Sequence, residues 1–140
     1  MSIRTVVYIL SALAALVVVL TRVRLRREGG AGRSRVSMVV VNAHTVFGVL
    51  AVLAWAGYLF APDSLPVSRE SLGIVALAFF WIVTLCGLLI LLRWLPTRGR
   101  HASAAQDDTW SDGPGLSILA HVGMLAGVIV LTGAYMLNKV

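Results

Sequence analysis

Four long apolar runs, separated by short polar segments, constrain this chain more than any other feature. They cover residues 5–21, 36–61, 72–92 and 116–137. A helix needs about 20 mostly apolar residues to cross a bilayer, and each run is close to that length. Because the hydrocarbon offers no water to bond the backbone, each run must pair its own N–H and C=O groups. We therefore expect an all-α polytopic membrane protein, a single domain over residues 1–140 with four transmembrane helices in a bundle.

Composition excludes the main alternatives to a membrane protein. Hydrophobic residues make up 59% of the chain and charged residues 13%, with a mean hydropathy of +0.89. Soluble domains carry about twice that share of charge, so a soluble, disordered or fibrous protein is excluded. Cys86 is the sole cysteine, which rules out an intrachain disulfide and a cysteine-based zinc site. Of the 12 basic residues only Lys139 is a lysine, a bias typical of GC-rich bacterial genomes.

The first apolar run resembles a signal peptide in length but not in its flanks. Only Arg4 precedes it, no A-x-A cleavage site follows it, and a basic segment over residues 22–27 comes instead. A basic flank after an apolar run stops transfer through the membrane. We therefore expect the first run to remain as a helix.

The basic residues predict how the chain is oriented. Segments 22–35 and 93–115 together carry nine arginines, whereas the other side has only Arg4, Arg69 and Lys139. The positive-inside rule places the nine in the cytoplasm. Segments 22–35 and 93–115 are then cytoplasmic loops, and both termini lie outside a bacterial inner membrane. Since topology explains this net charge of +6, we expect no nucleic-acid partner.

The second and fourth runs share a short motif. Ala43-His44 matches Ala120-His121, and a tyrosine follows each histidine fourteen residues later, Tyr58 and Tyr135. Each of these runs also follows an apolar run that ends at an arginine. The chain can thus be read as two tandem helical hairpins in the same orientation, a parallel repeat about an axis along the membrane normal.

The two histidines are expected at similar depth. At 1.5 Å per residue His44 lies about 12 Å beyond residue 36, and His121 about 8 Å beyond residue 116. Fourteen residues return to within roughly 40° of the same helix face, so each tyrosine shares the face of its histidine near the other membrane surface. Tyrosines are common at that level in any case. Polar side chains within spans usually face the bundle interior, which favours facing histidines.

Other polar and small residues in the spans have simpler interpretations. Asn42 lies about 200° around the helix from His44 and is expected to bond another helix. The threonines are expected to bond carbonyls of their own helices (Thr45, Thr84 and Thr132). Glycines within the spans, Gly87 among them, allow close helix packing and would also let a flat macrocycle lie against the backbone.

Two histidines on different helices at one depth fit the axial ligation of haem iron. His44 and His121 would bind one b-type haem between the second and fourth spans, with no other metal site. The haem propionates would need cationic partners, for which Arg35 and Arg93 are candidates, with Arg33 and Arg98 beside them. Attachment would be non-covalent because the chain has no C-x-x-C-H motif.

In its four spans and paired histidines the chain resembles four-helix membrane b-type cytochromes and the haem-carrying membrane anchor subunits of respiratory complexes. The resemblance implies electron transfer to or from a quinone or a partner's redox centre. It also implies other membrane subunits and lipids as partners. With one haem and no second centre, the chain would not carry electrons across the membrane alone.

Two other functions stay open. A non-catalytic accessory or assembly subunit of a larger membrane complex would fit the small size and the broadly apolar helices. A proton or metal transport component would use the histidines as a relay, but the spans lack acidic residues and zinc needs more than two ligands. No nucleophile–base pair or phosphate loop is present in the sequence, so we expect no catalytic activity of its own.

Overall fold

The computed structural model describes residues 1–27, 37–62, 64, 66–94 and 114–140, which form four α-helices. α1 spans Ile3–Arg27, α2 spans Met38–Phe60, α3 spans Arg69–Trp94 and α4 spans Pro114–Met136. All four are long and apolar enough to cross a membrane. The predicted all-α fold with four transmembrane helices is confirmed, and the chain is a multi-pass membrane protein.

Helix ends lie close to the predicted spans except at the end of α1. This helix continues to Arg27, so the prediction of a loop from residue 22 is wrong for its first six residues. The basic segment contains good helix formers and meets its first glycine only at Gly29. At the start of α3, the backbone N–H of Ser71 donates to the Ser68 hydroxyl, a side-chain cap that begins the helix before the predicted residue 72.

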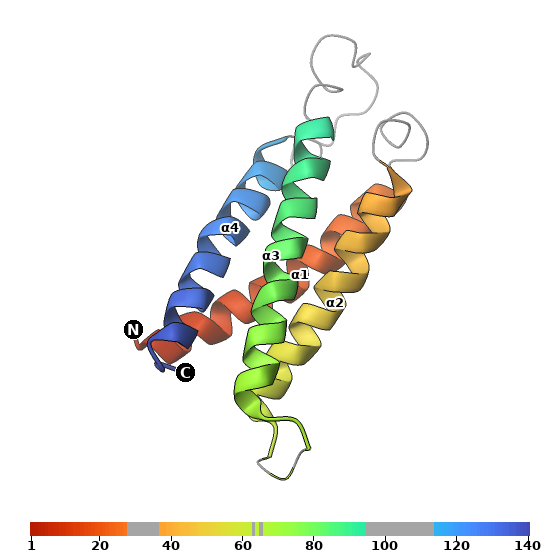
Figure 1. Cartoon of the computed structure of the whole chain (residues 1–140). Helices are drawn as coiled ribbons and strands as arrows, with labels where there is room; N and C mark the ends of the chain where they lie inside the picture. Colours follow the sequence, from red (N-terminus) through yellow and green to blue (C-terminus); the bar gives the residue numbers. More distant parts are fainter. Residues whose placement is uncertain (28–36, 63, 65, 95–113) are drawn as a thin grey trace, which may run out of the picture.

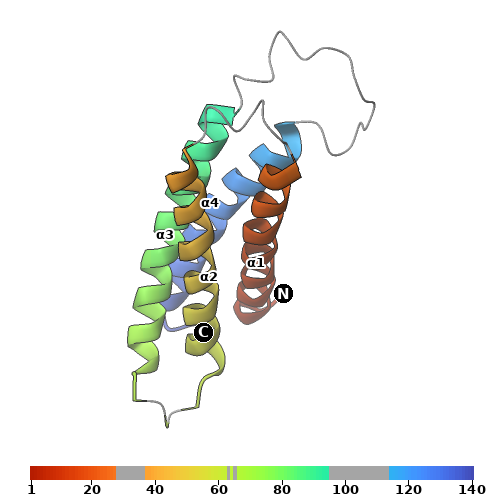
Figure 2. The same ribbon diagram turned by 90° about the vertical axis from the view of Figure 1, so that its right-hand side faces the viewer.

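The helices pack in the cyclic order α1, α2, α3, α4, with the most extensive interface between α2 and α3. α2 and α4 therefore face each other diagonally across the bundle. Both termini lie at the same end, and the connection between α2 and α3 is at that end too (Figure 1). Figure 2 shows α2 and α3 running side by side along their length, with α1 on the opposite flank.

α1 crosses the bundle rather than following one neighbour (Figure 1). Near its start it packs on α4, where a Cβ at Gly127 would lie 3.3 Å from Cδ2 of Leu10. Near its end it packs on α2, where Val18 lies so close to Gly48 that a Cβ there would sit 2.6 Å from its side chain. Glycines at both crossings let α1 approach two helices that lie diagonally across the bundle.

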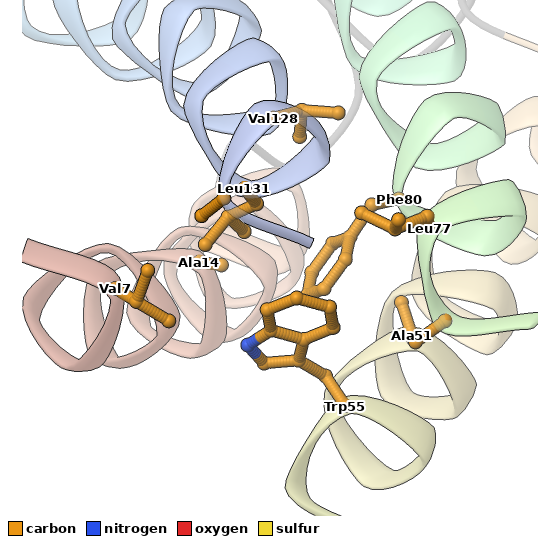
Figure 3. Packing of buried hydrophobic residues seen from close by; sticks show 10 residues of the cluster. Val7, Ala14, Ala51, Trp55, Leu77, Phe80, Val128 and Leu131 are labelled. Atoms are coloured by element: carbon orange, nitrogen blue, oxygen red, sulfur yellow. The ribbon is translucent and has the colours of Figure 1, made fainter. Parts of the chain in front are cut away.

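The main hydrophobic core joins all four helices (Figure 3). Trp55 of α2 is 1% exposed and contacts Phe80 of α3 edge-on, with 6.2 Å between ring centroids. Leu131 and Val128 of α4 and Val7 of α1 complete the group of largest fully buried side chains. Within the described part of the chain a second cluster contains only Val41 and Ile90 as buried members.

Two tryptophans tie neighbouring helices by the same device. The Trp55 indole N–H donates to the Ser11 hydroxyl of α1 at 2.9 Å, and the Trp81 indole N–H donates to the Thr132 hydroxyl of α4 at 3.3 Å. Each hydroxyl in turn donates to a carbonyl one turn earlier in its own helix. The indole N–H groups and hydroxyls of these two hydrogen-bonded pairs thus have partners inside the bundle, as a low-dielectric environment requires.

Candidate functional site

The two histidines of the repeat meet inside the bundle. His44 on α2 is 2% exposed, and its ring centroid lies 6.3 Å from that of the half-buried His121 on α4. The ring planes are inclined at 45°. α2 and α4 are diagonal helices, so the imidazoles bridge the bundle axis. The predicted facing arrangement of the histidines is confirmed.

The spacing of the small and large residues on α2 explains why His44 points inward. Its buried positions are Val41, His44, Gly48, Ala51 and Trp55, which recur every three or four residues. That period places them on one face of a helix, the face that packs on α1 and α3. His44 is thus carried into the interior by the same stripe that carries Trp55.

A third helix completes this level through Gly87 of α3. A Cβ at Gly87 would lie 2.7 Å from Cδ2 of His121, 3.3 Å from its Nε2 and 3.4 Å from Nε2 of His44. Both Nε2 atoms therefore lie within 3.4 Å of the position that a Cβ of residue 87 would occupy. Any side chain at position 87 would displace an imidazole, so the absence of a Cβ is a requirement of this site. We call His44, His121 and Gly87 the histidine level.

Fourteen residues away the same three helices form a second level. The rings of Tyr58 on α2 and Tyr135 on α4 lie 5.3 Å apart, edge to face, and both would be contacted by a Cβ at Gly73 of α3. The prediction that each tyrosine shares the face of its histidine is confirmed. We call Tyr58, Tyr135 and Gly73 the tyrosine level.

Sequence reasoning did not assign Gly87 or Gly73 a specific place. A signal was nevertheless present, because the two glycines are fourteen residues apart, as are His44 and Tyr58. α3 runs antiparallel to α2 and α4, so the order of the levels is reversed along it. The pairing of these positions could be recognised only once α3 was placed between α2 and α4.

The arginines predicted to hold propionates cannot be located at the site. Arg35 lies outside the described residues, and the side chain of Arg93, near the end of α3, is also not described. Arg22 of α1 does reach this end of the bundle, where its Nη1 donates to Oδ1 of Asn42 at 3.0 Å. The prediction that Asn42 bonds another helix is confirmed.

The remaining polar groups at this end are satisfied within their helices. The hydroxyls of Thr45 and Thr84 donate to carbonyls four residues earlier, as expected, and Thr132 does the same near the tyrosine level. The described residues contain no group of three or more His, Cys, Asp or Glu side chains that could hold a metal ion. Among these residues the histidine level therefore offers two imidazole nitrogens and no carboxylate.

Two opposed imidazoles suit a metal whose other ligands come from elsewhere. A tetrahedral zinc site needs at least three protein ligands, which the described residues at this level do not provide. Haem iron needs one or two axial ligands, since the macrocycle supplies four nitrogens.

No protein-family model, curated protein or solved structure matches this chain. A function for the chain therefore rests on the geometry of its own residues.

Proposed function

We propose that the chain is a small integral membrane subunit that binds one b-type haem between α2 and α4, with His44 and His121 as axial ligands. It would act in membrane electron transfer or as the anchor of a respiratory complex. The observation that supports this function is the separation of the two imidazoles across the bundle, 6.3 Å between ring centroids.

This separation fits two ligands on one iron. A histidine nitrogen binds a metal at about 2 Å, so two imidazoles on opposite sides of one ion have centroids roughly 6 Å apart. Both Nε2 atoms lie close to the same point on α3. The donor type, the number of donors and the separation of the ring centroids are those expected of a bis-histidine site, which supports the proposal.

The described side chains around the histidines are largely apolar, as a haem site in a membrane requires. Gly87 has no Cβ, so both imidazoles can lie close to the α3 backbone. Phe47 of α2 and Phe79 of α3 form an aromatic pair with centroids 5.5 Å apart, and Val41 and Ile90 are buried together near the cytoplasm-facing end that we propose. Bound haem would supply one-electron redox chemistry. His44 and His121 would together hold it between α2 and α4.

The cellular setting is part of the same proposal. The nine arginines of segments 22–35 and 93–115 favour a cytoplasmic histidine end, with the tyrosine level and both termini outside a bacterial inner membrane. Electrons would pass to or from a quinone or the redox centre of another membrane subunit. We expect no catalytic activity of the chain on its own.

An absorption spectrum of the purified protein tests the haem assignment. After expression with adequate haem supply, the oxidised and dithionite-reduced spectra should show a low-spin b-type haem at about one per chain. His44→Ala and His121→Ala should each abolish that spectrum. Tyr58→Phe and Tyr135→Phe, the matched positions of the other level, should keep it.

The same experiment distinguishes the alternatives. A colourless protein that stays colourless on adding haem, with intact helical circular dichroism, would contradict the haem assignment. Tolerance of both histidine substitutions together with co-purification of large partners would then favour an accessory or assembly subunit. The proton or metal transport function has less support, because the described spans add no third ligand to the two histidines.

A further inference from the structure

A polar cavity opens at the end of the bundle opposite the histidine level. It has a volume of about 520 Å³ and is lined from all four helices. The charged side chains that line it are Arg4 of α1 and Arg69 and Glu70 of α3, and its tyrosines are Tyr8, Tyr58 and Tyr135. The main chain of Val140, the last residue of the sequence, also lines it and adds a negative charge. This volume is within the range typical of small-molecule sites.

The cavity lies where all four spans end. The apolar segments long enough to span a membrane begin at Ile3 in α1 and Arg69 in α3, and they end at Phe60 in α2 and Met136 in α4. Tyrosines typically mark the depth of lipid headgroups. A ligand in this cavity would therefore meet the polar region of the bilayer, in which phosphate groups are abundant.

The arginines supply donors suited to a phosphate. Arg69 is held in place because its Nε and Nη2 donate to the carbonyls of Tyr58 and Leu59 at the end of α2. Arg4 also lines the cavity and makes no hydrogen bond or ion pair with any other residue that the structure describes. Guanidinium groups bind phosphate oxygens through paired, charge-assisted hydrogen bonds.

An apolar rim lies beside these polar groups. Tyr8 and Phe60 stack with ring centroids 5.8 Å apart and planes 12° from parallel. Phe60 is 68% exposed and Met136, also at the cavity, is 73% exposed. Acyl chains could run along these side chains into the hydrocarbon while the head stays in the cavity. A soluble anion would make no use of such a rim.

From this juxtaposition we propose that the cavity binds the phosphodiester head of an anionic phospholipid of the phosphatidylglycerol type, with Arg4 as its principal contact. A phosphatidylcholine head carries a compensating cation that Arg4 and Arg69 would repel. Glu70 at the same cavity works against an anion, so its charge limits the affinity. The proposal does not depend on haem binding.

Photo-crosslinking tests the site in the full chain. The protein is reconstituted in phosphatidylcholine vesicles that contain a phosphatidylglycerol with a photoreactive headgroup, and crosslinked peptides are mapped by mass spectrometry. We expect crosslinks within the segments that line the cavity. Arg4→Gln should reduce crosslinking there about five-fold to ten-fold, and Arg4→Lys should restore part of it.

The sign of the charge provides a second test. Glu70→Gln should increase phosphatidylglycerol crosslinking about two-fold to five-fold, because it removes a repulsive charge. Arg22→Gln at the opposite end is the matched control and should leave crosslinking at the cavity unchanged. Helical circular dichroism checks that each variant folds.

Three outcomes would overturn the proposal. The first is equal crosslinking of the wild type and Arg4→Gln at the cavity. The second is equal crosslinking by a phosphatidylcholine with the same photoreactive group. The third is that soluble glycerol phosphate reduces crosslinking at the cavity as effectively as unlabelled phosphatidylglycerol does. This result would identify a soluble phosphate as the ligand.

Discussion

The histidine level and the tyrosine level are built alike but are held in different ways. Each takes one ring from α2, one ring from α4 and a glycine from α3, and the two levels are about 21 Å apart along the helices. At the tyrosine level both hydroxyls donate to backbone carbonyls, Tyr58 to Val140 and Tyr135 to Glu70. At the histidine level the ring nitrogens converge on one point beside Gly87.

The packing around the two levels differs as well. The main core, which contains Trp55, Phe80 and Leu131, lies next to the tyrosine level. Near the histidine level the described buried cluster contains only Val41 and Ile90. The comparison indicates that the half around the tyrosine level contributes most of the buried core. The other half contains the two histidines, which are the side chains able to bind a ligand. Substitutions should therefore separate stability from ligand binding.

Trp55→Ala should have the largest effect on stability. It removes the largest fully buried side chain and a hydrogen bond to Ser11, so the free energy of unfolding should fall by on the order of 3 kcal/mol. Denaturant unfolding in detergent micelles, followed by circular dichroism, measures the loss. Trp81→Ala, at a partly buried position, is the control; an equal or larger loss there would contradict the assignment of the core to Trp55.

Gly87→Ala and Gly73→Ala should distinguish most clearly between the roles of the histidine level and the tyrosine level. Each added methyl group overlaps a ring, that of His121 or that of Tyr135, and should destabilise the protein by about 1–3 kcal/mol. If the chain binds haem as proposed, only Gly87→Ala should also weaken its retention, because this substitution displaces an imidazole. Haem loss on dilution, followed by absorbance, measures this. Equal haem loss from both variants would show that the effect is one of general packing.

Removing the tyrosine hydroxyls should have a smaller effect. Tyr58→Phe leaves the carbonyl of Val140 without its donor and should cost about 1 kcal/mol. Tyr135→Phe should cost less, because its hydrogen bond to Glu70 is exposed. Unfolding measurements in micelles rank the two variants, and the reverse order would contradict the exposure difference.

Asn42→Ala should have the smallest effect on stability of all these substitutions. It removes one exposed hydrogen bond from Arg22, a contact expected to contribute about 0.5 kcal/mol. Because Asn42 lies on a different face of α2 from His44, the substitution should not change the reduced absorption spectrum of the proposed haem. A shift of that spectrum would show that α1 is coupled to the histidine level and would weaken the division between the two halves.

Much of the fold could be predicted from the sequence because a bilayer imposes simple rules. Run length and the need to satisfy the backbone predict four helices, and the 3.6-residue period places His44 with Tyr58 and His121 with Tyr135 on common faces. The helical segment 22–27 was missed, since charge marks the end of an apolar run but does not end a helix.

Only the tertiary structure decided which faces meet. In a membrane, apolar surface is equally stable against lipid or protein, so hydropathy alone does not determine helix neighbours. Close approach at glycines does: Gly48 admits Val18 of α1, Gly87 admits His121 and Gly73 admits Tyr135. The sequence by itself therefore determined the four spans and the helix faces that carry the histidines and tyrosines. Steric fit between helices decided that the two histidines meet at Gly87 and the two tyrosines at Gly73 of α3.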